Sequence, residues 1–359
     1  MIREQRVRLL NLIESKKANL PWYVNEFLEH LDGENASPNT QLDYCYDIES
    51  FLDWIIAEGI HTGESRNIPI EVLEKLKVKD MTTYQNHCKN YLGNKRNTIA
   101  RKLSSLKSLF YYLSQVAEDE DLYPYLKRNV MAKIKIYKEK SSKKKMAEHI
   151  ASSILLGEEF RDFREFIAAG YGHKLAMDMN SKRLLSGYHR NRERDLAFAS
   201  LILGSGLRAS EALSINIDNI DWTKNMVHVT RKGDIVDFVV FSDLAAQDLR
   251  DYISVRQDRY DVSPKEKALF LSCPTKNGRS TRVTLRAMQK RFERYFKAYE
   301  KNTMSIHKLR HSFATKHFQE NNNLAMLKEL LNHSDINTTM IYTHVLSNEI
   351  QDSVNKADK

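Results

Sequence analysis

Two short stretches near the carboxyl end of the chain gather residues that can bind ions and move protons. HKLRHSFATKHF and HSDINTTMIYTH, which begin at residues 307 and 333, together hold five histidines, one arginine and one tyrosine. His307 and His311 have the i, i+4 spacing that places two imidazoles on one helix face, as in zinc sites. Arg310 lies within one turn of both rings, however, and a lysine stands where a zinc protease motif has its glutamate. Because a cation would meet positive charge there, we predict no metal site.

The same arrangement suits an anion. His307 and Arg310, at i and i+3, share a helix face on which an imidazole and a forked guanidinium can bind two oxygens of one phosphate. The Arg208 guanidinium can bind further phosphate oxygens. Arg208 opens a helix after the glycine turn at residues 204–206, where free backbone N–H groups also favour an anion. Lys232 would come from the turn of a predicted β-hairpin.

Two further residues complete the set. His333 ends the helical run LKELLNH, and Tyr342 is the one tyrosine of the second stretch. Taken singly, each candidate has an ordinary structural explanation: a surface salt bridge for the arginine and lysine, a satisfied histidine, or a packed aromatic ring. Only together, in their order along the chain, do they favour one shared site.

The preceding half of the chain predicts a helical domain, residues 1–137. Apolar residues recur at helical spacing in the segments 20–31, 37–59, 78–92 and 94–115. In the second segment, Ser37 and Pro38 supply a cap and a first-turn proline. The inner face predicted for that helix consists of Leu42, Tyr46, Ile48, Phe51, Leu52 and Ile55.

The last of these helices is basic. Its positive residues are Lys95, Arg96, Arg101, Lys102 and Lys107. Their position near a threonine and several serines suits contacts with DNA phosphates. A charged helix face that is simply solvated is the ordinary alternative.

A lysine-rich segment, residues 138–149, has few large apolar residues and predicts an interdomain linker. The second predicted domain, residues 150–359, is mainly α-helical with a small β-sheet. Two β-rich runs around a glycine indicate a hairpin at residues 225–241, whereas residues 173–193 predict only a loop or short helices. Helices are predicted at 157–172, at 284–301, 306–320 and 324–333, and at 337–354, on either side of Tyr342.

Composition bounds the partners. The 359 residues include 56 Lys and Arg against 47 Asp and Glu, a net charge of +9, which suits nucleic acid or an anionic membrane surface but also an ordinary basic protein. Three widely spaced cysteines offer neither a disulfide framework nor a zinc pattern. The charged N-terminus lacks the apolar region of a signal peptide, and no segment approaches a membrane-spanning length. We therefore expect a cytoplasmic protein.

Four boxes then carry a family resemblance. GSGLRASEAL, TRKGD, HKLRHSFAT and LLNHSDINTTMIYTH follow one another between about Ser205 and His344, and their order resembles that of the tyrosine recombinase/integrase family. The resemblance implies a helical core-binding domain and an α+β catalytic domain that form a C-shaped clamp around DNA. LPWYV near the start, RNVM before the linker and the spacing before RERDLAF most resemble Xer recombinases that act as a single protein at a chromosomal dif site. Asn332 departs from the family, which usually has glycine there.

The resemblance also implies a mechanism. Tyr342 would attack a DNA phosphodiester and leave a 3′-phosphotyrosyl enzyme and a free 5′-hydroxyl, which needs no cofactor. Arg208, Arg310 and His333 would stabilise the developing charge, while His307 would assist proton transfer and phosphate binding. Lys232 would protonate the leaving oxygen, and Glu211, one turn after Arg208, would support that site.

The implied partners are double-stranded DNA with paired half-sites and three further copies of the chain, in a homotetramer on two DNA sites. A DNA translocase or another accessory protein can join such an assembly. After Tyr342, the tail residues Val345, Leu346, Ile350 and Val354 recur at helical spacing and predict a tail helix that docks in a neighbouring copy or on its own domain. An integrase of a mobile element, a type IB topoisomerase and a non-catalytic DNA-binding protein remain alternatives.

Overall fold

The computed structural model describes residues 3–137, 150–231, 236–274, 278–332, 339, 340 and 342. The chain divides into two compact units, Met1–Lys140 and Ser141–Lys359. The predicted linker, residues 138–149, lies outside the described residues. Within the described part of the chain, no helix is long and apolar enough to span a membrane.

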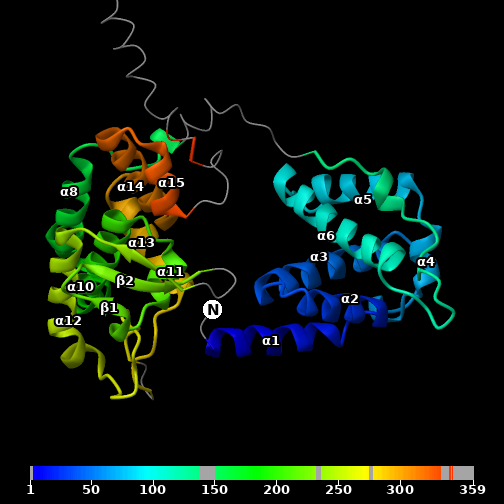
Figure 1. The fold of residues 1–359 in the computed structure, drawn as a ribbon, viewed down its shortest axis with the longest axis horizontal. Helices are drawn as coiled ribbons and strands as arrows, with labels where there is room; N and C mark the ends of the chain where they lie inside the picture. Colours follow the sequence, from blue (N-terminus) through cyan, green and yellow to red (C-terminus); the bar gives the residue numbers. More distant parts are fainter. Residues whose placement is uncertain are drawn as a thin grey trace, which may run out of the picture. The chain divides into compact units, whose positions relative to one another are not determined.

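The first unit is built from helices (Figure 1). They are α1 (Arg3–Lys17), α2 (Trp22–Gly33), α3 (Pro38–Ala57), α4 (Ile70–Lys75), α5 (Val78–Asn90) and α6 (Arg96–Gln115), with 3₁₀ turns at Ser65–Asn67 and Val130–Lys133. α3 and α6 pack against each other; α1 covers α3, α5 covers α6, and α2 contacts both. The predicted helical character of this half is confirmed.

α3 shows how the sequence directs this packing. The Ser37 hydroxyl caps its N-terminus by accepting a hydrogen bond from the Thr40 amide at 3.2 Å, as predicted. The inner face is buried at Ile48, Phe51, Leu52 and Ile55. Tyr46 was predicted on that face but is 45% exposed, because a residue two positions before Ile48 lies about 160° away around a helix of about 3.6 residues per turn. Its ring lies under the Lys16 ammonium instead.

The second unit surrounds the long helix α10 (Lys182–Ser205), which packs along α12 (Asp243–Tyr260) and contacts α14 (Ile306–Asn321) (Figure 1). The remaining helices are α8 (Glu159–Glu165), α9 (Tyr171–Ala176), α11 (Ala209–Ser214), α13 (Leu285–Ala298) and α15 (Leu324–Leu331). A π-helical turn at Phe166–Gly170 joins α8 to α9, and 3₁₀ turns lie at Met179–Ser181 and Ile217–Asn219.

A small antiparallel sheet completes this unit, with strand order β1 (Ile220–Asp221), β2 (Met226–Thr230) and β3 (Val236–Val240). β2 and β3 pair from Met226 with Val240 to Thr230 with Val236, which confirms the predicted hairpin. Its turn, residues 232–235, lies outside the described residues. Because β2 contacts α11, the sheet holds Arg231, the last described residue before that turn, beside the helix that follows Arg208.

Two helices differ from the sequence pattern. Residues 182–193 are not a loop or short helices but the first half of α10. The apolar pattern hides this half because buried positions are polar: Asn191, for example, accepts a hydrogen bond from the Tyr260 hydroxyl at 3.0 Å. α12 lacks a clear apolar stripe for the same reason, since its buried residues include Asp248, which pairs with Arg164, and Arg256, which donates to the Ala268 carbonyl at 2.6 Å.

The helix predicted at residues 337–354 and the tail after it lie outside the described residues, apart from Thr339, Met340 and Tyr342. Tyr342 is buried among a small separate cluster of apolar residues. The cluster contains Ala314, Phe318, Leu327 and Leu331.

Candidate active site

Arg208 is positioned by a glycine turn at the end of α10. Gly206 has φ +70°, and a Cβ at this position would lie 2.5 Å from the Phe313 ring and 3.0 Å from Leu331. Glycine is therefore required both by the backbone conformation and by the close approach of α14 and α15. α11 begins directly afterwards with Arg208 as its N-cap, close to the predicted helix start.

One detail of the sequence prediction is corrected here. The Arg208 amide is not free to bind an anion, because it donates a hydrogen bond to the Glu211 carboxylate at 2.8 Å. The Arg208 guanidinium donates to the other oxygen of the same carboxylate at 2.9 Å. Glu211 therefore holds both the backbone and the side chain of Arg208, an arrangement consistent with the supporting role predicted for it.

Glu211 also connects Arg208 with two other arginines. Its carboxylate lies 3.7 Å from Arg231 and 3.8 Å from Arg310. Arg231, the last described residue before the hairpin turn, pairs in addition with Asp237 at 2.7 Å. Three guanidiniums thus outnumber two carboxylates, and the net positive charge favours a phosphate.

Arg310 holds three helices together. It lies on α14 and donates hydrogen bonds to the carbonyl oxygens of Gly206 at 2.8 Å and Leu331 at 2.6 Å, at the ends of α10 and α15. Burial lowers the pKa of Arg310 to about 10, and the nearby charge of Arg208 adds to the shift. The guanidinium remains charged at neutral pH and brings its charge to the centre of the site.

The imidazoles of α14 lie beside Tyr342. The Tyr342 hydroxyl and Nδ1 of His311 are 2.8 Å apart. His307 meets His311 edge to face, with ring centroids 4.7 Å apart. Partial burial, then the charges of Arg310, Lys308 and Arg208, lower the pKa of His307 below 6.5, so this ring is neutral at neutral pH.

Tyr342 is only 1% exposed. Burial raises its pKa to about 12, although the charge of Arg310 opposes the shift. The phenol is therefore protonated at neutral pH and needs a proton acceptor before it can act as a nucleophile. His311 was not connected with Tyr342 from the sequence; its spacing from His307 was a signal for one shared helix face, but not for this contact.

Two predicted catalytic residues, Lys232 and His333, lie outside the described residues. The described residues before them are clear. β2 ends at Thr230, followed by Arg231 directly before Lys232, and α15 ends at Leu331, followed by Asn332 directly before His333. Asn332, at the usual glycine position, has φ 45° and ψ 57° and caps α15 in the left-handed conformation, which asparagine tolerates better than most residues.

The five basic residues predicted to bind DNA differ in their availability. Lys95 and Arg96 are exposed, and Lys107 is half-buried. Arg101 pairs with the buried carboxylate of Asp47 at 2.6 Å, and the buried Lys102 amine donates to the Ser50 hydroxyl at 2.7 Å. The last two residues therefore stabilise the contact between α3 and α6, and the first three present the free charge of this helix.

A phenol beside an imidazole and a group of arginines can do one reaction well, the attack of the phenol oxygen on a phosphodiester. Among the described residues, no group of three or more His, Cys, Asp or Glu could hold a metal ion. The class of protein indicated is an enzyme that breaks and rejoins DNA through a tyrosine.

Comparison with known proteins gives the same class. The model of the phage integrase family matches residues 178–349, and that of the phage integrase N-terminal SAM-like domain matches residues 24–116. Tyrosine recombinase XerS of Streptococcus mutans serotype c is 33% identical over 362 residues, 98% of this chain and 99% of that protein. XerS of Streptococcus agalactiae serotype III is 33% identical over 365 residues, with the same coverage. The chain belongs to the tyrosine recombinase family, as its motifs predicted.

Solved recombinases share its fold. The XerH site-specific recombinase bound to a palindromic difH substrate, in a post-cleavage complex, has a TM-score of 0.63 at 20% identity, over 90% of this chain and 82% of that one. The Tn1549 transposon integrase in complex with circular intermediate DNA has a TM-score of 0.59 at 19% identity, over 89% and 94% of the two chains. The predicted fold class, a mainly helical recombinase with a small β-sheet in its catalytic part, is confirmed.

Proposed function

We propose that this enzyme is a Xer-type recombinase that resolves chromosome dimers at a dif-type site during chromosome segregation. The support is similarity to XerS proteins over nearly the whole chain and a fold shared with XerH, which was solved on its difH substrate. On this proposal the partners are DNA with paired half-sites and three further copies of the chain. A DNA translocase or accessory protein can assist. The protein would act in the cytoplasm, on the nucleoid.

The proposed reaction uses the residues of the candidate active site. The Tyr342 oxygen attacks the phosphorus of one strand, the 5′-oxygen leaves, and the new 3′-phosphotyrosyl ester retains the energy of the broken bond. Arg208, Arg310 and His333 stabilise the charge on the phosphorane. His307 binds the phosphate and assists proton transfer, and Lys232 donates a proton to the leaving oxygen.

To these residues we add His311 as the acceptor of the Tyr342 proton. The 2.8 Å contact is within the reach of a general base. Nδ1 can accept the proton when the imidazole is neutral and carries its hydrogen on Nε2. Because the hydroxyl is buried in this structure, we propose that DNA binding shifts the segment of Tyr342 until its oxygen reaches the phosphate with the imidazole still in contact.

The observation that carries the proposal is the 2.8 Å contact of the Tyr342 hydroxyl with His311, close enough to Arg310 for its charge to act on the phenol. Tyr342→Phe removes only that hydroxyl, so the variant should bind DNA with unchanged affinity and form no covalent adduct. The test is a nicked duplex that traps the adduct, resolved on a denaturing gel. An adduct with the purified variant would show that another residue attacks.

An integrase of a mobile element is the second candidate, favoured by the fold shared with the Tn1549 integrase. Mapping covalent protein–DNA adducts across the genome separates the two functions. A single chromosomal site is expected for dimer resolution, whereas the ends of an element are expected for an integrase. Cleavage without preference for paired sites would instead indicate a type IB topoisomerase.

A further inference from the structure

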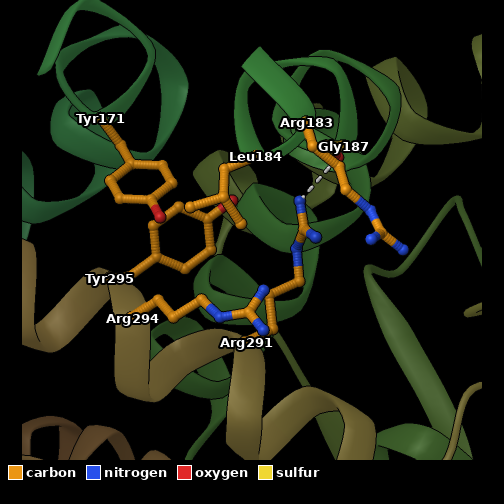
Figure 2. Close-up of a pocket in the computed structure, with 7 residues that line it drawn as sticks. All are labelled: Tyr171, Arg183, Leu184, Gly187, Arg291, Arg294 and Tyr295. Atoms are coloured by element: carbon orange, nitrogen blue, oxygen red, sulfur yellow. Dashed lines mark hydrogen bonds between the residues drawn. The ribbon is translucent and has the colours of Figure 1, made fainter. Parts of the chain in front are cut away.

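A second group of arginines lines a cavity away from the active-site residues. The cavity has a volume of about 380 Å³ and lies between α9, α10 and α13 (Figure 2). Its lining is mainly basic and aromatic, and consists of Arg183, Arg291, Arg294, Tyr171, Tyr295, Leu184 and Gly187. None of these residues belongs to the recombinase motifs.

Arg291 forms the fixed floor of this cavity. Its guanidinium pairs with the buried carboxylate of Asp195 and donates to the Gly187 carbonyl at 2.9 Å (Figure 2). Asp195 also pairs with Arg194 at 2.7 Å and accepts a hydrogen bond from the Tyr295 hydroxyl at 2.8 Å. One carboxylate thus serves two guanidiniums, so the floor itself carries net positive charge.

Arg183 and Arg294 form the rim. Both are exposed, and within the described part of the chain neither makes a hydrogen bond or an ion pair. Figure 2 shows the Arg294 side chain reaching toward Arg291. Burial raises the pKa of Tyr171, and the charges of Arg294 and Arg291 oppose that shift, which places both guanidiniums near the Tyr171 hydroxyl.

We propose that this cavity binds a phosphate ester other than the one that is cut. Guanidinium forks match phosphate oxygens in pairs, and the uncompensated charge of the rim favours a strongly charged anion. The volume exceeds that of a phosphate group, and the rings of Tyr171 and Tyr295, 4.7 Å apart, form with Leu184 an apolar wall for an attached sugar or base. The ester can come from a free nucleotide or from the DNA backbone.

Gly187 allows this proposal to be tested by charge alone. A Cβ at Gly187 would meet nothing within 4 Å, so the helix accepts a side chain there. Gly187→Glu places a carboxylate at the cavity wall, and Gly187→Gln is its neutral control of the same size. Arg183→Ala with Arg294→Ala removes the rim, and Arg190→Ala, an exposed arginine of the same helix, is the control for lost charge.

In the first arm, each full-length variant also carries Arg208→Ala, which weakens phosphate binding at the active site equally in all of them. Binding of fluorescently labelled adenosine monophosphate is followed by polarisation. We expect Gly187→Glu and the double alanine variant to weaken binding at least tenfold, and Gly187→Gln and Arg190→Ala to leave it unchanged. This readout does not depend on recombination, so it stands or falls separately from the proposed function.

In the second arm, the same variants bind a random-sequence duplex at several salt concentrations. Each phosphate contact contributes about 0.9 to the slope of log affinity against log salt. If the DNA backbone occupies the cavity, loss of the rim should reduce the slope by about 1 to 2. A change confined to the nucleotide arm would identify a free nucleotide as the ligand. Unchanged nucleotide binding together with an unchanged slope would overturn the proposal, and Gly187→Glu gives this answer even if the double variant does not fold.

Discussion

The Tyr342 hydroxyl is held 2.8 Å from Nδ1 of His311. The contact joins the proposed nucleophile to α14, the same helix that carries Arg310 and His307. With a pKa raised to about 12 by burial, a phenol is ionised in only about one molecule in 10⁵ at pH 7. A proton acceptor at hydrogen-bond distance removes the need for this rare ionised form, because it can take the proton as the phenol oxygen attacks.

His311→Ala should therefore slow single-turnover cleavage about 100-fold at pH 7, the low end of what a general base contributes. The pH profile should change as well. Cleavage by the variant should rise about tenfold per pH unit through the neutral range, because it depends on the rare phenolate of a group with a pKa of about 12.

His317→Ala, on the same helix but outside the site, is the matched control and should keep the wild-type profile. Faster cleavage by His311→Ala than by the wild type would show the opposite role, a hydrogen bond that restrains Tyr342. An unchanged rate would remove His311 from the mechanism.

The sites of Arg208 and Arg310 could be predicted from the sequence because each has a strong local signal. A glycine turn fixes the first, and helical spacing from His307 places the second. The contact between His311 and Tyr342 could not, because it joins residues 31 positions apart and depends on how Tyr342 packs against Phe318 and Leu331.

The prediction of the helices from the sequence met the same limit. The predicted helices of the first unit have clear apolar faces, whereas the first half of α10 is held in part by buried polar residues such as Asn191. A polar residue that will be buried cannot be told from a solvated one until its partner is known. The arginine cavity was missed for a different reason, because Arg183 and Arg294 lie more than 100 positions apart in the sequence and only the fold brings them to one cavity.

Glu211→Gln should weaken both stability and cleavage. The neutral amide keeps the shape but leaves Arg208, Arg231 and Arg310 without the carboxylate they share. We expect the free energy of unfolding to fall by roughly 1 to 3 kcal/mol, measured by urea denaturation. The cleavage rate should fall by a larger factor than the affinity for DNA, because Arg208 loses its position and not its charge.

Asp218→Asn is the control for this change, since it breaks an exposed pair with Lys267 and should leave stability and cleavage nearly unchanged. If Glu211→Gln cleaves DNA at the wild-type rate, Glu211 does not position Arg208 for the reaction.

Lys232→Ala should distinguish phosphate binding from leaving-group protonation. Cleavage of an ordinary phosphodiester should slow strongly, whereas cleavage of a substrate with a 5′-bridging sulfur should slow little, because a thiolate leaves without a proton. Rates on both substrates are measured in single turnover. Equal slowing on the two would exclude Lys232 as the proton donor.

Deletion of residues 347–359 should test whether the tail couples neighbouring copies. The apolar residues Val345, Leu346, Ile350 and Val354 lie on a segment too short to form a stable helix alone, so they need a groove in which to pack. If that groove belongs to a neighbouring copy, the truncated protein should bind a single half-site with nearly unchanged affinity but fill paired half-sites with much less cooperativity and exchange strands slowly.

Replacing only Ile350 and Val354 with serine should reproduce the defect, while Asn355→Ala with Lys356→Ala, which leaves the apolar stripe intact, should not. Gel-shift titrations on one and two half-sites, with a strand-exchange assay, measure these effects. Cooperative binding and exchange at the wild-type level by the truncated protein would show that the tail is not the coupling element and that the contact lies elsewhere.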